Sequence, residues 1–248
     1  MTQAPPPGQH RLTIHGVEAG YGTTFILRDI SFEAHGGDVV GLIGPNGSGK
    51  STLLKAIAGV LPMRAGEVRI DGAPLRAVAE RVAFVPQRED VNWDFPVTAL
   101  DVVLMGRYRR CGWLRRPGSR DRRMAAEALD RLGLGGMGGR HISQFSGGQQ
   151  QRIFLARAMV QEPLVVVLDE PFTGIDAENR AVFHETIRDF SRRGAIVLMA
   201  THDLDEVHAT CSHVCCLNGR LIAYGPAAAT FTPKNLRATF GGRVAVFA

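Results

Sequence analysis

Alternation of apolar and polar residues predicts several β-strands in the first third of the chain. The alternation covers residues 11–18 and 29–34, and shorter apolar segments at 67–71 and 82–85 predict two more strands. Residues 39–43 are apolar throughout, which is typical of a strand buried on both faces. This part of the chain therefore reads mainly as β-structure, with its most buried strand at 39–43.

From residue 97 to about residue 159 the spacing of apolar positions changes to that of helices. Helical periodicity covers 97–105, 124–132 and 148–159. Two loops interrupt it, an arginine-rich one containing Pro117-Gly118-Ser119 and a glycine-rich one at 133–139. The middle of the chain is thus predicted to form a helical region.

Strands and helices alternate again after residue 160. Strands are predicted at 164–168, 195–200 and 213–217, and helices at 178–192 and 204–209. Such alternation indicates a parallel sheet with helices on its faces. Near the end, Thr232 followed by Pro233 fits a helix N-cap and first position, and predicts a short helix to about Phe240.

Composition and charge narrow the class of protein. The 248 residues are 45% hydrophobic and 21% charged, as in an ordinary globular protein. The apolar runs are too short to span a bilayer and the first residues lack a signal-peptide core, so we expect a cytoplasmic chain unless a partner holds it at a membrane. The net charge is +5. Much of the excess lies at Arg107, Arg109, Arg110, Arg115, Arg116, Arg120, Arg122 and Arg123.

That arginine cluster allows two interpretations. It is either a solvated basic loop or a surface that faces phospholipid head groups or an acidic partner. No ladder of aromatic residues accompanies it, which disfavours single-stranded nucleic acid as a partner.

The four cysteines also allow two interpretations. Cys211, Cys215 and Cys216, with His213 nearby, could be drawn as a metal site. The alternative, which the apolar neighbours favour, is a buried strand in which the thiols act as small apolar groups. Cys111 stands apart from the other three, and the chain has no Cys-x-x-Cys pair.

A phosphate-binding loop follows the buried strand 39–43 and precedes a predicted helix at 50–58. Glycines let several backbone N–H groups converge on an anion, and the start of the helix adds its positive dipole end. A lysine in the loop supplies charge for the β- and γ-phosphates, and the following hydroxyl is a suitable Mg²⁺ ligand. The loop residues are Gly44, Pro45, Asn46, Gly47, Ser48, Gly49, Lys50, Ser51 and Thr52.

Two further motifs carry chemistry downstream. The apolar strand at 164–168 ends in Asp169 and Glu170, of which the first can hold Mg²⁺ and the second can polarise an attacking water. Upstream of them, a serine before two glycines at a helix start predicts a second anion site, formed by Ser146, Gly147, Gly148 and Gln149. A second phosphate site makes sense if two chains pair head to tail, each closing the nucleotide of the other.

Three single residues complete the candidate site. His202 follows the strand at 195–200, at the carboxyl edge of the sheet, where it can hydrogen-bond a γ-phosphate. Gln87 follows the strand at 82–85 and can reach Mg²⁺ or the water in the same way. Tyr21 lies before the loop and offers an aromatic face for adenine.

With these motifs in this order, the chain resembles the ATP-binding cassette family over residues 11–217. The resemblance implies an α/β fold of the P-loop NTPase class, with a RecA-like parallel-sheet core, an antiparallel β subdomain and a helical signature subdomain. It also implies a head-to-tail homodimer with two ATP molecules and Mg²⁺ at the interface, and Tyr21 stacked on adenine. Two departures, Phe145 before the signature serine and Gly174-Ile175-Asp176-Ala177 after the acidic strand, predict altered packing with retained chemistry.

The same resemblance suggests domain limits. Residues 1–10 would be a flexible tail, 11–225 the ATPase domain with its helical subdomain at about 90–160, and 226–248 a C-terminal helical tail. DNA-repair and translation cassettes usually carry coiled-coil inserts or tandem cassettes, and this chain has one phosphate loop and one signature. That favours the ATPase subunit of a transporter whose membrane subunits are separate chains.

The segment between Asn92 and Leu114 narrows the class of transporter. Residues 92–98, 103–108 and 112–114 resemble the ATPases of bacterial manganese, zinc and iron importers. Siderophore and cobalamin importers, and non-transport cassettes of the iron–sulfur assembly type, are the alternatives. The implied partners are two integral membrane permease subunits and a periplasmic or lipid-anchored metal-binding protein, with no nucleic acid. The chain would then lie at the cytoplasmic face of the membrane.

One docking hypothesis follows from that resemblance. The cleft near Gln87 would grip a cytoplasmic helix of the permease. Trp93, Phe95 and Met105 would provide the apolar contact, and Arg107 the charged rim.

Overall fold

A parallel sheet of five strands, extended by one antiparallel strand, forms the centre of the molecule. The computed structural model describes residues 10–111, 116–175 and 177–241. The sheet order is β10-β9-β3-β8-β7-β6, and its pairs are parallel except β10 with β9. Its strands are β3 (Val39–Ile43), β6 (Val82–Val85), β7 (Val165–Asp169), β8 (Ile196–Ala200), β9 (His213–Leu217) and β10 (Leu221–Pro226).

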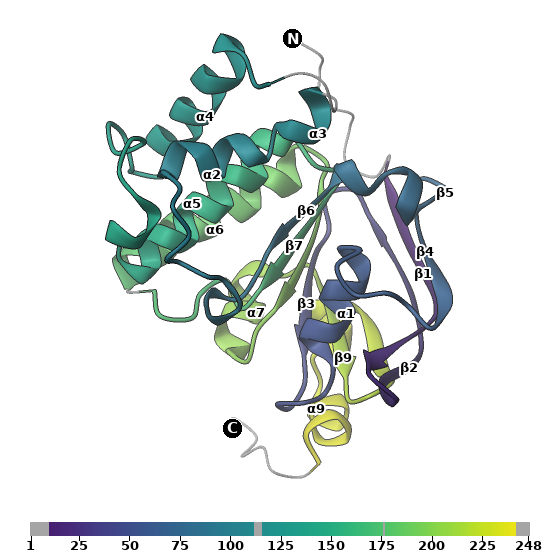
Figure 1. Ribbon diagram of the computed structural model, residues 1–248. Helices are drawn as coiled ribbons and strands as arrows, with labels where there is room; N and C mark the ends of the chain where they lie inside the picture. The colour runs from purple at the N-terminus through teal and green to yellow at the C-terminus, as the bar shows by residue number, and fades with distance from the viewer. Residues whose placement is uncertain (1–9, 112–115, 176, 242–248) are drawn as a thin grey trace.

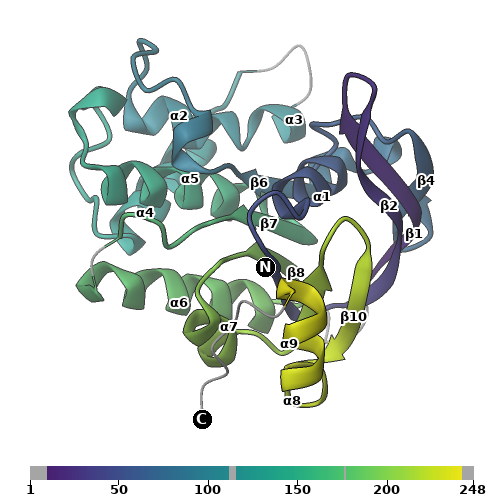
Figure 2. The same cartoon turned by 90° about the horizontal axis from the view of Figure 1, so that it is seen from below.

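A second, antiparallel sheet lies beside the first (Figure 1). Its order is β2-β1-β4-β5. Its strands are β1 (Arg11–Tyr21), β2 (Thr24–His35), β4 (Ala65–Ile70) and β5 (Ala73–Pro74). Helix α1 (Lys50–Ile57) lies between the two sheets, as the view from below also shows (Figure 2).

Helices cover the other face of the parallel sheet. α2 (Ala99–Met105), α4 (Ser119–Arg131) and α5 (Gly147–Gln161) pack on one another, and α3 (Tyr108–Cys111) follows α2. The remaining helices are α6 (Ala177–Arg192), α7 (Leu204–Thr210), α8 (Ala227–Thr230) and α9 (Pro233–Phe240). Among the described residues no helix is both long and apolar enough to cross a membrane.

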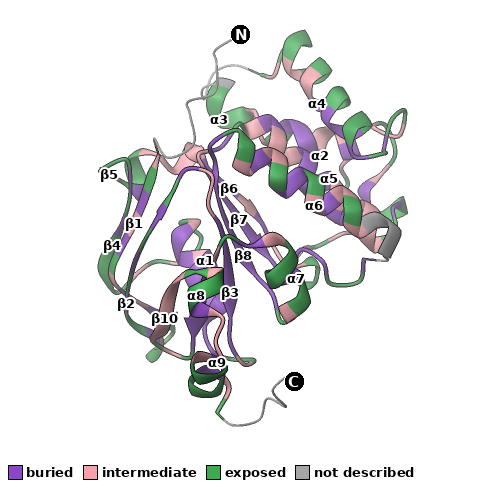
Figure 3. Ribbon diagram, turned by 180° about the vertical axis from the view of Figure 1, so that it is seen from behind, coloured by how far each residue is buried: buried purple, intermediate pink, exposed green. Residues whose placement is uncertain are grey.

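The central strands divide the hydrophobic core into two clusters. Successive side chains of a strand point to opposite faces. In β7, Val165 and Val167 therefore belong to the cluster with α1 and the antiparallel sheet, and Val166 and Leu168 to the cluster with the helices. All five residues of β3, β7 and β8 are buried (Figure 3), so the sheet is a rigid platform for whatever follows its carboxyl ends.

The sequence-based expectations match this arrangement closely in the parallel strands, which are wholly or mostly buried, and β7 and β8 differ from the predicted bounds by one residue. β3, β6 and β9 begin and end where the sequence predicts. Missed elements include β10, whose residues are mostly half-buried and give no alternation. The helix expected from residue 124 begins at Ser119, because its charged first turn lacks apolar positions.

Buried thiols, not a metal site, account for the cysteine group. Cys211, Cys215 and Cys216 are buried, the last two within β9. Burial raises the pKa of each of these thiols, and that of Cys211 to about 12. The buried-strand interpretation is therefore confirmed for Cys215 and Cys216, and Cys211 is buried at the end of α7. The side chain of Cys111, and all of Trp113, Leu114, Arg115 and Asp176, lie outside the described residues.

Candidate functional site

The glycine-rich loop between β3 and α1 is held tightly against neighbouring backbone. A Cβ added to Gly44 would lie 2.0 Å from the carbonyl oxygen of Leu217. Gly49 has φ +100, and an added Cβ there would lie 2.4 Å from Leu27. These positions therefore require glycine, the first for space and the second for both space and backbone conformation.

Two side chains of the loop, Lys50 and Ser48, are buried and can donate hydrogen bonds. Lys50 is buried, and its Nζ donates to the carbonyl oxygens of Gly44 at 2.8 Å and Pro45 at 3.1 Å. Burial lowers the pKa of Lys50, while the charges of Glu170 and Asp169 oppose that shift. The buried hydroxyl of Ser48 has no hydrogen-bond partner among the described residues. Such a cradle suits an anion, which would supply the missing acceptor and favour the charged lysine.

Two side-chain oxygens, the Ser51 hydroxyl and the Asp169 carboxylate, face each other beside the loop. The Ser51 hydroxyl donates to Oδ1 of Asp169 at 2.9 Å. Asp169 ends β7 and is fully buried, and its Oδ2 has no partner among the described residues. Burial raises the pKa of Asp169, and the Ser51 hydrogen bond opposes the shift. A buried carboxylate oxygen without a donor, next to a hydroxyl, fits a hard divalent cation such as Mg²⁺.

Glu170 is held in an unusual backbone conformation directly after β7. Its φ is +48, and its N–H donates to the carbonyl oxygen of Ala200 at 3.1 Å. Its Oε2 accepts from the Thr173 hydroxyl at 3.0 Å and lies 3.6 Å from Nδ1 of His202. The carboxylate is thus fixed at the carboxyl edge of the sheet, beside the histidine that follows β8.

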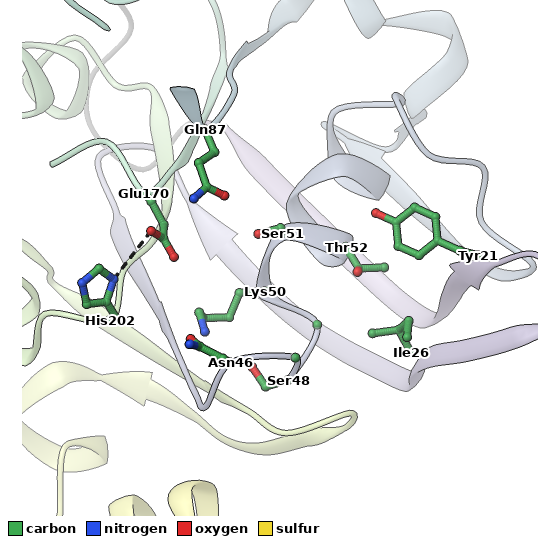
Figure 4. A pocket seen from close by; sticks show the side chains of 12 residues that line it. Tyr21, Ile26, Asn46, Ser48, Lys50, Ser51, Thr52, Gln87, Glu170 and His202 are labelled. Atoms are coloured by element: carbon green, nitrogen blue, oxygen red, sulfur yellow. Dashed lines mark ion pairs between the residues drawn. The ribbon is translucent and has the colours of Figure 1, made fainter. Parts of the chain in front are cut away.

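A cavity of about 650 Å³ unites these groups (Figure 4). Tyr21 and Ile26 lie at one end, Gln87, Glu170 and His202 at the other, and Lys50 and Ser51 between them. The lining residues are Tyr21, Ile26, Asn46, Gly47, Ser48, Gly49, Lys50, Ser51, Thr52, Gln87, Glu170 and His202.

All but one of these lining residues were candidates from the sequence. The exception is Ile26, which gives no sequence signal because it is one apolar residue of a strand. Its place opposite Tyr21 depends on the pairing of β1 with β2. Gly44, Pro45 and Asp169 do not line the cavity, but they hold Lys50 and Ser51, which do.

The signature residues lie apart from this cavity. Ser146 is exposed and caps α5: its hydroxyl accepts from the N–H of Gln149 at 3.4 Å, and Oε1 of Gln149 accepts from the N–H of Ser146 at 2.9 Å. Neither residue lines the cavity, nor do Gly147 and Gly148. Phe145, one of the two departures, is buried in the core, and the Arg140 guanidinium lies 5.0 Å from its ring centre.

Comparison with known proteins places the chain in a family. The model of the ABC transporter family matches residues 27–173. The chain belongs to the ATP-binding cassette transporter family. As an ABC ATPase it binds and hydrolyses ATP, and the expected fold class is confirmed. The ATP-binding subunit of an ABC transporter superposes with a TM-score of 0.76 at 27% identity, covering 94% of this chain and 95% of that one. A chain of an inward-facing, metal-chelate type ABC transporter gives a TM-score of 0.80 at 29% identity, covering 94% and 89%.

Two curated relatives illustrate the branch of ABC ATPases to which the chain is similar. It is 46% identical over 219 residues to the zinc transport system ATP-binding protein TroB of Treponema pallidum (strain Nichols), covering 88% of this chain and 82% of that protein. It is 43% identical over 231 residues to the manganese transport system ATP-binding protein MntB of Bacillus subtilis (strain 168), covering 93% and 92%.

Proposed function

We propose that this ABC ATPase powers a bacterial importer of divalent metal ions, manganese, zinc or iron. The observation that carries the proposal is the similarity, at 46% and 43% identity over most of the chain, to ATP-binding proteins of zinc and manganese transport systems. The 42% identical YfeB of Yersinia pestis belongs to a chelated iron transport system. In this proposal the metal is cargo of the permease, and the ATPase itself need not touch it.

The cavity is the proposed ATP site. Tyr21 and Ile26 would hold adenine between an aromatic ring and an aliphatic side chain, and the loop N–H groups with Lys50 would hold the phosphates. Ser51 and Asp169, with Gln87, would hold Mg²⁺. When bound, that ion would neutralise charge on the phosphate oxygens.

Glu170 is the proposed general base. Its carboxylate is held by Thr173 and lies at the phosphate end of the cavity, where it can accept a proton from an attacking water. His202, 3.6 Å from that carboxylate, would donate a hydrogen bond to the γ-phosphate. Gln87 would orient the water from the facing wall of the cavity.

A homodimer completes the proposed site. Ser146 is exposed and lies outside the cavity of its own chain, so its capped helix start is available to the nucleotide of a second copy. We propose the head-to-tail pairing in which each phosphate loop is closed by the partner's signature. The ATPase domain would span 11–225, with a helical subdomain at about 90–160 and a C-terminal tail at 226–248.

The remaining proposed partners are two permease subunits and a periplasmic or lipid-anchored metal-binding protein, with the ATPase at the cytoplasmic face of the membrane. The side chains of Phe95, Met105 and Tyr108 are exposed by 57%, 38% and 50% and form the proposed permease contact.

The structure changes two details of the docking hypothesis. Trp93 packs edge-on against Phe154, and its indole N–H donates to the carbonyl oxygen of Arg88. Arg107 is largely buried, with its Nε 2.8 Å from Asp121, and donates to the carbonyl oxygen of Val160. Arg107 therefore supports the helical region and does not form the charged rim, and Trp93, which is half-buried, supports the helical region rather than the apolar docking contact in this proposal.

Metal uptake by a deletion strain tests the proposal. Cells lacking this chain should lose high-affinity uptake of radioactive manganese, zinc or iron, and the plasmid-borne wild type should restore it where Lys50→Ala does not. Normal uptake of all three metals together with a failure on a siderophore or cobalamin would overturn the metal assignment and leave the ATPase intact. Co-purification with an integral membrane protein would separate a transporter subunit from a non-transport cassette.

A further inference from the structure

Side chains of helix α5 hydrogen-bond to the backbone edge of β6 that pairs with no further strand among the described residues. β6 is the edge strand of the parallel sheet, and α5 lies along it (Figure 1). Carbonyl oxygens of alternate residues on this edge accept hydrogen bonds from α5 side chains: Val82 from Gln161 at 2.7 Å, Phe84 from Arg157 at 2.6 Å and Pro86 from Gln151 at 3.5 Å. The period of two is that of a strand edge. The helix and the segment that leads to Gln87 are thus bonded at several successive points.

The series of bonds continues past Gln87 to the first turn of α5. Nε of Arg88 donates to Oε1 of Gln150 at 3.2 Å. Gln150 is only 3% exposed, and its Nε2 donates to the carbonyl oxygen of Ile142 at 3.2 Å. Because the amide has partners on both sides, it gives the arginine a fixed attachment point.

The same arginine lies against the bare backbone of Gly147. A Cβ added to Gly147 would lie 2.9 Å from Nε and 3.1 Å from Cζ of Arg88. Gly147 has no positive φ, so its backbone conformation alone does not require glycine. A side chain at position 147 would therefore push the guanidinium away from the place in which its Nε donates to Gln150.

The backbone of Arg88 is held as well as its side chain. Its carbonyl oxygen accepts from the indole of Trp93 at 2.9 Å, and that ring packs on Phe154 of α5 with 5.2 Å between ring centres. Asp90, two residues further, pairs with Lys55 of α1 at 2.7 Å. The segment that follows Gln87 is therefore joined both to α5 and to the helix after the phosphate loop.

We infer that Arg88 is a positioning residue that fixes the signature turn at Ser146–Gly147 relative to Gln87. This inference rests on the proposed function. In that function Gln87 contacts the nucleotide bound by its own chain, and Ser146 contacts the nucleotide bound by the partner chain. A shift of Gln87 would then move the signature by the same amount, so each chain presents its signature only when its own glutamine is in place. Without Arg88 the signature turn would lose its direct bond to the residue after Gln87 and, among the described residues, would be held only through the contacts further along α5.

A stability cycle tests the contact without nucleotide. Gly147→Ala alone should lower the melting temperature, because the new Cβ displaces the guanidinium from its hydrogen bond with Gln150. In the Arg88→Ala background the same change should raise the melting temperature, because alanine is the better helix residue once the collision is gone. If Gly147→Ala changed the melting temperature by the same amount and with the same sign in both backgrounds, the inference would be wrong, independently of any result on ATP hydrolysis.

An enzymatic test addresses the coupling. In Arg88→Ala, binding of a fluorescent ATP analogue to the single chain should stay within about 2-fold of wild type, while kcat falls by about 10-fold because the signature is misplaced. Arg88→Lys, which keeps a donor for Gln150, should restore most of the turnover. The matched control is Glu89→Ala, an exposed neighbour with no side-chain partner among the described residues, and it should match wild type.

The outcomes separate two failures. Absence of ATP hydrolysis in both wild type and Glu89→Ala would refute the nucleotide roles proposed for Gln87 and Ser146, and the stability cycle would still decide the arginine contact. Normal hydrolysis in wild type together with an unchanged kcat in Arg88→Ala would refute the positioning role alone. A loss of analogue binding in Arg88→Ala equal to the loss of kcat would also refute it, since the arginine would then act on the site of its own chain.

Discussion

Replacing Asp169 by asparagine should make the nucleotide-free protein more stable. The carboxylate is fully buried, and only Oδ1 has a donor, the Ser51 hydroxyl at 2.9 Å. Leaving a buried polar atom without a partner costs about 1–3 kcal/mol, and more when it is charged. Asparagine keeps the acceptor for Ser51 and removes the charge, while its amide NH2 takes the unpartnered position of Oδ2, so the gain comes from removing the buried charge alone. We therefore expect the free energy of unfolding to rise by about 1–3 kcal/mol, or about 2–4 °C in melting temperature per kcal/mol for a chain of this size.

The pH dependence gives the sign of the effect independently. Burial raises the pKa of Asp169 above 3.8, its value in the unfolded chain. Folding therefore favours the protonated acid, and the wild type loses stability as the pH rises from about 3.8 through the raised pKa. The stability advantage of Asp169→Asn should be complete above that pKa and vanish below about pH 4.

Thermal or urea unfolding between pH 4 and 8 is the assay, with Glu127→Gln as the control because Glu127 is exposed in the middle of α4. The control should differ from wild type by no more than about 0.5 kcal/mol. Addition of Mg²⁺ and ATP should reverse the order, since ligand at 100 times its Kd adds about 2.7 kcal/mol to the wild type and less to the variant. An asparagine variant less stable than wild type at neutral pH without nucleotide would refute the reasoning from the buried charge.

Three further predictions concern the ATPase and its permease contact. Lys50→Ala should nearly abolish phosphate release while circular dichroism shows a folded chain, and turnover near wild type would remove the lysine from the site. Glu170→Gln should lower turnover by about 10²-fold or more and accumulate an ATP-bound dimer in gel filtration; normal hydrolysis, or a monomer at high protein concentration, contradicts its role. Phe95→Ala should leave the stability and ATPase activity of the isolated chain unchanged and reduce metal uptake in cells. Trp93→Ala should lower the free energy of unfolding by about 2 kcal/mol, because it removes packing on α5. If the two variants behaved alike, the assignment of Phe95 to docking and Trp93 to internal packing would be wrong.

The sequence predicts the cavity well because its motifs follow the strands of one parallel sheet. Lys50 comes after β3, Gln87 after β6, Glu170 after β7 and His202 after β8. Carboxyl ends of parallel strands meet at one edge, so correct strands place these side chains together without knowledge of any contact. The four side chains do line one cavity.

Contacts of long polar or aromatic side chains with distant parts of the chain could not be predicted in the same way. Trp93 and Arg107 are amphipathic residues in a polar stretch, and sequence alone does not say whether such a residue faces a partner or its own core. The answer depends on Phe154 and Asp121, which lie 61 and 14 residues further along the chain. Arg88 illustrates the same limit, since its importance rests on its contact with Gly147, 59 residues away.

Four energetically costly features lie at or beside the proposed nucleotide site, although the described residues hold others elsewhere. Asp169 and Ser48 have buried oxygens without partners among the described residues, Lys50 has a pKa lowered by burial, and Glu170 has a left-handed backbone that costs a non-glycine residue about 1–3 kcal/mol. Under the proposed function a bound nucleotide with its cation would relieve the first three. Relief of these unfavourable features would add to the free energy of ATP binding. We therefore expect the residues of this cleft to gain more order on binding ATP than the rest of the chain.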